Sequence, residues 1–75
     1  MIHSVSLSAK TMRGKNKINE AGKPANWIVL EERDMIGFSD RQGPWLLVQP
    51  DNNTKDQSRW VHLTDDKDFE VKVVR

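Results

Sequence analysis

Short apolar segments, each beginning with a tryptophan, alternate with polar segments along this chain. Residues 27–30 have the sequence WIVL, residues 45–48 WLLV and residues 60–63 WVHL. A strictly alternating stretch, FEVKV, follows at residues 69–73. Short apolar or alternating runs that are separated by turn-forming residues are typical of β-strands. The pattern therefore predicts a small all-β domain.

Five strands are expected from this pattern. Near the N-terminus, apolar and polar residues alternate through SVSLSAK, which predicts a half-buried first strand. Because Pro44 cannot donate a hydrogen bond to a neighbouring strand, the third strand should begin at or just after it. The predicted strands cover residues 3–12, 27–33, 45–49, 59–64 and 69–74.

The segments between these strands are rich in turn-forming residues. Residues 14–25 contain two glycines, a proline and two asparagines, so we expect a long basic loop there and no stable helix. Residues 37–44 predict a second connection, residues 50–58 a hairpin tip, and residues 65–68 a single 3₁₀ turn. Long loops in compact domains are usually functional or disordered, so we expect residues 14–24 to be mobile.

Five strands in 75 residues must curl, because a flat sheet of this size could not cover its own face. The succession of a long loop, a medium loop, a tight hairpin and a 3₁₀ turn resembles that of SH3-like barrels, including their Tudor and KOW-type relatives. Residues 59–71 look like the strand, turn and strand that close those barrels. The resemblance implies one five-stranded SH3-like barrel over residues 1–75 and a general habit of binding, but no site residues. The OB-fold is the alternative, although it normally needs more residues and a helix between strands.

Alternation within the strands also assigns side chains to faces. In the strand at residues 59–64, Val61 and Leu63 share the face that we assign to the core, which places Trp60 and His62 on the outer face. The second and third strands are apolar on both faces, so part of their outer surface should be exposed or covered by another group. The predicted core comprises Val5, Leu7, Val29, Val61, Leu63, Phe69, Val71 and Val73.

The formal net charge of +1 is unevenly distributed along the chain. Residues 1–25 hold five Lys and Arg against one Glu, a net charge of +4, whereas residues 26–75 hold seven against ten acidic residues, a net charge of −3. The absence of cysteine favours a reducing compartment. There is no visible secretory signal and no apolar run near the ~18 residues of a membrane span. We therefore expect a cytoplasmic protein that does not bind membranes.

No residue pattern indicates catalysis or metal binding. His3 and His62 are the only histidines, and their spacing matches neither a nucleophile–histidine pair nor a zinc site. Asp65, Asp66 and Asp68 lack the additional ligands of an EF-hand loop, so a solvated, capping turn is expected instead. We expect a non-enzymatic protein without cofactor or metal.

Two binding functions remain open. The basic loop could follow a phosphate backbone beside an exposed tryptophan that stacks on bases, which predicts contact with nucleic acid or with a nucleic-acid-handling complex. Alternatively, the apolar outer strand faces dock a protein or a second copy of the chain, as in a small inhibitory or accessory protein. The candidate binding residues are Arg13, Lys15, Lys17, Lys23, Phe38, Arg41, Trp45, Arg59 and Trp60.

Overall fold

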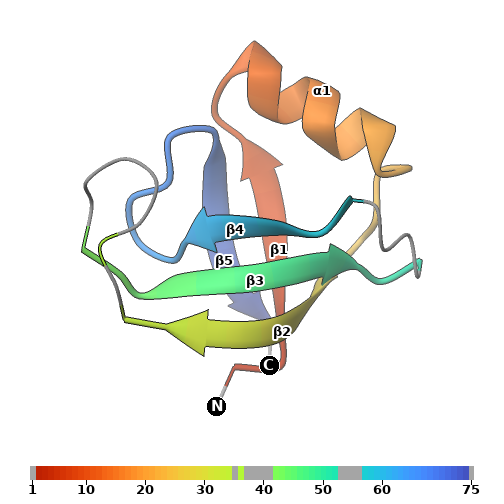
Figure 1. The fold of residues 1–75 in the computed structure, drawn as a ribbon. Helices are drawn as coiled ribbons and strands as arrows, with labels where there is room; N and C mark the ends of the chain where they lie inside the picture. The colour runs from red at the N-terminus through yellow and green to blue at the C-terminus, as the bar shows by residue number, and fades with distance from the viewer. Residues whose placement is uncertain (1, 35, 37–41, 53–56, 75) are drawn as a thin grey trace.

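A single antiparallel sheet of five strands and one α-helix make up the fold (Figure 1). The computed structural model describes residues 2–34, 36, 42–52 and 57–74. The prediction of an all-β protein with five strands is confirmed. Within the described ranges, no helix has the length and apolar character needed to cross a membrane. The elements are β1 (Ser4–Ala9), α1 (Met12–Glu20), β2 (Trp27–Arg33), β3 (Trp45–Pro50), β4 (Arg59–His62) and β5 (Phe69–Val74).

The strands lie in the order β4-β3-β2-β1-β5, and each hydrogen-bonded pair is antiparallel. The sheet curls into a half-barrel, so that its two edge strands, β4 and β5, approach each other (Figure 1). In the β2–β3 pair, Val29 lies opposite Val48 and Glu31 opposite Leu47, which leaves Leu30 as an extra residue. This β-bulge increases the local twist and bend of β2, which the curled sheet requires.

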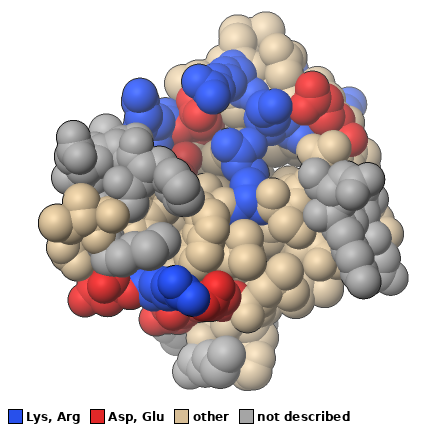
Figure 2. Space-filling view, in the orientation of Figure 1, with Lys and Arg blue, Asp and Glu red and all other residues tan. Residues whose placement is uncertain are grey.

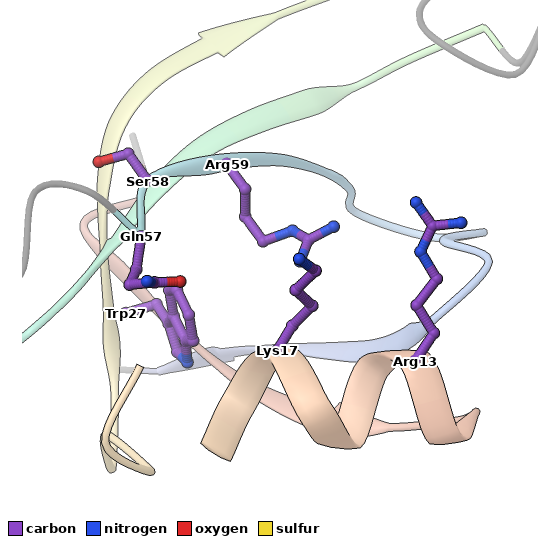
Figure 3. Close-up of a pocket in the computed structure, with 6 residues that line it drawn as sticks. All are labelled: Arg13, Lys17, Trp27, Gln57, Ser58 and Arg59. Atoms are coloured by element: carbon purple, nitrogen blue, oxygen red, sulfur yellow. The ribbon is translucent and has the colours of Figure 1, made fainter. Parts of the chain in front are cut away.

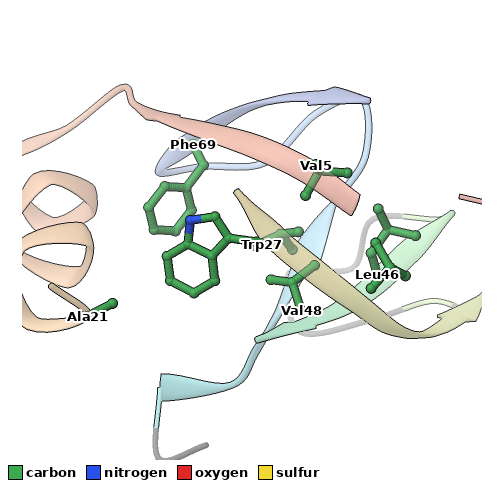
Figure 4. Close-up of a cluster of buried hydrophobic side chains, with 8 residues drawn as sticks. Val5, Ala21, Trp27, Leu46, Val48 and Phe69 are labelled. Atoms are coloured by element: carbon green, nitrogen blue, oxygen red, sulfur yellow. The ribbon is translucent and has the colours of Figure 1, made fainter. Parts of the chain in front are cut away.

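The core lies on the concave side of the sheet, with α1 beside it (Figure 4). Figure 4 shows the rings of Trp27 and Phe69 side by side, with Ala21 of the helix region near them. Four residues of the predicted core are buried there, and Leu7, Leu63 and Val71 pack against the cluster from partly buried positions. The buried cluster comprises Val5, Ala21, Trp27, Val29, Leu46, Val48, Val61 and Phe69.

The prediction that Val73 is buried is wrong, because its side chain is 42% exposed. Val73 lies near the end of β5, which is an edge strand with only β1 as a hydrogen-bonded neighbour. Alternation assigns a side chain to a face, but it does not say how far along the strand that face is covered. Burial along β5 therefore decreases from Phe69, which is 1% exposed, to Val73.

The long basic loop predicted for residues 14–25 is wrong, because most of this segment is the helix α1. The helix begins at Thr11, whose hydroxyl oxygen accepts a hydrogen bond from the Gly14 amide at 3.0 Å. It ends at Gly22, which has a φ of 82°. The amides of Gly22 and Lys23 donate to the carbonyls of Asn19 and Ile18, an arrangement that closes helix C-termini. Gly22 therefore marks the end of a helix.

A narrow face of small residues packs α1 against the rest of the molecule. Gly14, Ile18 and Ala21 are spaced so that they share one side of the helix. A Cβ atom on Gly14 would lie only 2.3 Å from the carbonyl oxygen of Asp68, so glycine is required for this close approach. The hydroxyl of Thr11 also donates to Asp68 Oδ1 at 2.8 Å. The helix is thus fixed to the connection between β4 and β5.

The connection between β4 and β5 is a hydrogen-bonded turn, and the predicted 3₁₀ turn at residues 65–68 is not seen. The Asp66 carboxylate accepts from the backbone amides of His62, Asp68 and Phe69 at 2.9–3.1 Å. This capping role agrees with the turn expected there. Because the chain begins to turn at residue 63, β4 ends two residues before its predicted end at residue 64.

The predicted exposure of His62 is also wrong, since the residue is only 4% exposed. Its ring packs edge-on against Trp45, with the ring centres 5.0 Å apart. Nδ1 accepts hydrogen bonds from the amides of Thr64 and Asp65, and Nε2 lies 2.6 Å from the carbonyl oxygen of Gln42, to which it donates in this arrangement. His62 is covered by segments that sequence alternation within β4 cannot reveal.

Candidate binding site

The helix α1 sorts the basic residues of the N-terminal third into two groups. Arg13 and Lys17 are four residues apart, so they lie one turn apart on the same side of the helix. Lys15 lies two residues from each and therefore points to another side. Lys23 follows the helix in a left-handed conformation with a φ of 51°, and its side chain is exposed. Only Arg13 and Lys17 face β4.

An open pocket of about 300 Å³ lies between α1 and the beginning of β4 (Figure 3). Arg13 and Lys17 extend from the helix toward β4, and the side chain of Arg59 extends from β4 toward Lys17. Cationic groups from two separate elements thus converge on one space. The residues that line the pocket are Arg13, Lys17, Trp27, Gln57, Ser58 and Arg59.

The positive charges of the helix are only weakly balanced. Arg13 Nε lies 3.9 Å from Asp68 Oδ2, and Lys17 Nζ lies 3.5 Å from Glu20 Oε2. Such exposed ion pairs contribute about 0–1 kcal/mol, because solvent screens them. None of the described residues that line the pocket is acidic. Figure 2 shows Lys and Arg side chains gathered over α1 and the adjoining part of β4, with acidic groups at the margins. The pocket therefore has an excess of positive charge.

Arg59 is held more firmly than the two basic residues of the helix. Its guanidinium carbon lies 4.7 Å from the centre of the Phe69 ring, which is within the range of a cation–π interaction. Its Nε atom is buried and has no hydrogen-bond acceptor among the described residues. Since Phe69 belongs to the core, Arg59 covers the core at this end of the half-barrel and presents its charge to the pocket.

The three tryptophans occupy different environments. Trp27 is 1% exposed and forms part of the pocket wall, with its Nε1 buried and without an acceptor among the described residues. Trp45, a candidate binding residue, is 4% exposed and lies in the interior against His62. Trp60 is partly exposed and lies opposite Leu47 of β3. Of the three, only Trp60 offers a ring surface to a ligand.

The remaining candidate residues fall into two groups. Lys15 and Lys23 are exposed but do not line the pocket. Phe38 and Arg41 lie outside the described residues. The spacing of Arg13 and Lys17 would have grouped them, had the helix been recognised from its capping residues. No sequence signal marks the pocket residues that were missed, which are Trp27, Gln57 and Ser58.

A second surface lies on the convex side of the sheet. Ile28 and Leu30 of β2 are 39% and 49% exposed, and Leu47 and Trp60 of the neighbouring strands are partly buried. Leu47 and Trp60 lie directly opposite each other in the β3–β4 pair. We call these four residues the outer apolar face. Its existence agrees with the two-sided apolar pattern of the second and third strands.

The pocket contains groups that bind anions. Guanidinium and ammonium groups, an amide and a hydroxyl can hold and orient an acceptor-rich ligand. In the described part of the chain, no three His, Cys, Asp or Glu residues are grouped so that they could hold a metal ion. Comparisons with protein-family models, with curated proteins and with solved structures find no match. The functional assignment therefore depends on the geometry of the site.

Proposed function

We propose that this protein is a small non-catalytic binding module with an SH3-like barrel, and that it holds single-stranded nucleic acid across α1 and β4. The barrel assignment is supported by the strand order, in which four consecutive strands form a meander and β5 returns beside β1. The close approach of β4 and β5 would close such a barrel.

The observation that carries the proposal is the convergence of Arg13, Lys17 and Arg59 on one pocket. The charges come from a helix and from a strand far away in the sequence, so the fold brings together like charges that repel each other. A phosphate group placed between them would remove this repulsion and accept charge-assisted hydrogen bonds. Phosphate contacts of this kind supply most of the affinity in sequence-independent nucleic-acid binding.

The position of β4 at the edge of the sheet connects the pocket to Trp60. Arg59 and Trp60 are successive residues of one strand, so their side chains lie on opposite faces of the sheet. A nucleic-acid strand that passes over this edge would place a phosphate at Arg59 and a base against Trp60. Stacking on an aromatic ring contributes about 1–3 kcal/mol per base and does not depend strongly on sequence.

A titration with labelled oligonucleotides tests this function. Single-stranded and duplex DNA and RNA are measured by fluorescence anisotropy at several salt concentrations. Three phosphate contacts predict that log K falls with log salt with a slope of about −2 for single strands, since each contact contributes about −0.7. We expect single strands to bind more tightly than duplexes. Absence of binding at tens of micromolar protein in low salt would contradict the proposal.

The outer apolar face favours a second candidate function, which is docking to a protein of a nucleic-acid-handling complex. Ile28 and Leu30 are exposed apolar residues on adjacent parts of one strand, and Leu47 and Trp60 extend the same surface. Apolar docking changes little with salt, in contrast to phosphate binding. A partner captured from host lysate after nuclease treatment, and lost in Leu30→Asp, would support this function.

A further inference from the structure

We infer that the pocket between α1 and β4 binds a phosphate monoester dianion, and that in the proposed function this group is the terminal phosphate of a nucleic-acid strand. This inference rests on the proposed function for the identity of the ligand. The binding chemistry itself rests on the arrangement of Arg13, Lys17 and Arg59 around one space.

The arrangement of the charges favours a single compact anion. A phosphodiester backbone carries one negative charge per nucleotide, and its recognition typically uses cations spaced along a groove. Here the three cations surround one pocket of about 300 Å³. A phosphate monoester carries about −1.5 to −2 charges at neutral pH and has three strongly accepting oxygens. It therefore matches the concentrated positive charge better than an internal phosphate does.

Arg59 supplies the directional part of the site. The Phe69 ring occupies one face of its guanidinium group, which leaves hydrogen bonds only within the guanidinium plane. Arginine typically binds phosphate by two parallel hydrogen bonds in that plane. The unpartnered Nε of Arg59 is one donor that lacks an acceptor among the described residues, although it is buried in the unliganded protein. Binding an oxyanion would engage the outer edge of this same group.

Lys17 and Arg13 supply charge from the opposite wall. Both side chains extend from the helix toward Arg59 (Figure 3). Their present partners, Glu20 and Asp68, are at ion-pair distances of 3.5 Å and 3.9 Å, so either cation can turn to a ligand at little cost. The amide of Gln57 adds a neutral polar group at the rim.

Oligonucleotides of one sequence that differ only at their ends provide the test. We compare strands that carry a 5′-phosphate, a 3′-phosphate or hydroxyls at both ends. We expect one phosphorylated strand to bind roughly tenfold more tightly than the hydroxyl strand, as two added charge-assisted hydrogen bonds would allow. Equal affinity of all three strands would overturn this inference and leave the proposed function intact.

Matched variants locate the preference in the pocket. Lys17→Gln and Arg59→Met should abolish the preference for the phosphorylated end, and the methionine keeps the apolar stem over Phe69. Lys15→Gln removes the same charge from another side of α1 and should keep the preference. Retention of the full preference in Lys17→Gln and Arg59→Met would contradict the inference.

A measurement with inorganic phosphate alone separates the inference from the proposed function. The Nε–H signals of Arg59 and Trp27 are followed by NMR during a titration of the whole protein with phosphate at constant ionic strength. We expect the Arg59 signal to shift in a saturable way at millimolar phosphate, and the shift to be absent in Lys17→Gln. If no oligonucleotide binds but this shift is seen, the proposed function fails and the pocket chemistry stands. If phosphate causes no shift, the inference is overturned.

Discussion

The pocket between α1 and β4 and the outer apolar face differ in composition and in what holds them together. The pocket collects Arg13, Lys17 and Arg59 from two elements, so it exists only when the helix is correctly placed. The outer apolar face, with Ile28 and Leu30 as its most exposed members, lies on the sheet itself and does not require the helix. The comparison shows that one small domain offers two surfaces whose ligands should differ in charge and in salt dependence.

The two surfaces meet at the edge strand β4. Arg59 contributes to the pocket, whereas Trp60, the next residue, contributes to the outer apolar face. A ligand that crosses this edge would use both surfaces, and a ligand that uses only one of them would be insensitive to changes in the other. Substitutions on each side can therefore separate the two surfaces.

The largest expected effect comes from the sheet on which both surfaces depend. Leu46 is completely buried, so Leu46→Ala should lower the free energy of unfolding by about 2–5 kcal/mol through loss of contacts and cavity formation. Leu30→Ala makes the same chemical change at a position that is 49% exposed and should cost less than about 1 kcal/mol. Urea denaturation measures both values. Similar losses at the two leucines would contradict the assignment of the two faces.

The next effect separates the helix from the sheet. Gly14→Ala places a Cβ atom against the Asp68 carbonyl, so we expect destabilisation by about 1–3 kcal/mol from overpacking. Helix propensity alone would predict a gain of about 1 kcal/mol, because alanine is the better helix former. Asn16→Ala, at an exposed position of the same helix, is the control and should be neutral or slightly stabilising. Thermal denaturation decides between the two signs, and a stabilised Gly14→Ala would mean that α1 does not pack on the β4–β5 turn.

A binding measurement tests whether a ligand crosses the edge strand. Trp60→Leu keeps an apolar side chain opposite Leu47 but removes the aromatic surface. If a base stacks there, the affinity for single-stranded nucleic acid should fall by about 1–3 kcal/mol, and Trp60→Phe should restore most of it. Unchanged affinity in Trp60→Leu would confine the ligand to the pocket side of β4.

The strands could be predicted from the sequence because the spacing of apolar residues records which face is covered. The sequence of α1 does not show its packing in this way, since the packed face consists of Gly14, Ile18 and Ala21 and contains a single large apolar residue. The glycines suggested a loop, although Gly14 permits a close contact and Gly22 ends the helix. Local residues do encode the helix boundaries, in Thr11 and Gly22, and these signals would have indicated it.

The candidate site was only partly predictable for the same reason. Arg13, Lys17, Arg59 and Trp60 were identified as individual residues, but their convergence depends on the placement of α1. The burial of His62 depends on a contact with the Gln42 carbonyl, which is 20 residues away in the chain. Alternation within one strand cannot report contacts of this kind. Tertiary structure therefore decides which of the candidate residues form a site.

The central claim is that the placement of charge in the pocket, and not net charge alone, binds nucleic acid. Two double variants with equal charge test it: Arg13→Gln with Lys17→Gln inside the pocket, and Lys15→Gln with Lys23→Gln outside it. Each changes the formal net charge from +1 to −1.

The decisive measurement is the salt dependence of single-strand affinity for the parent protein and for both double variants. We predict that the pocket variant loses two phosphate contacts, so that the slope of log K against log salt decreases in magnitude by about 1.4, while the outside variant keeps nearly the parental slope. Circular dichroism verifies that both variants remain folded. Equal slopes in the two variants would contradict the claim, because the charge of the helix would then act without regard to its position.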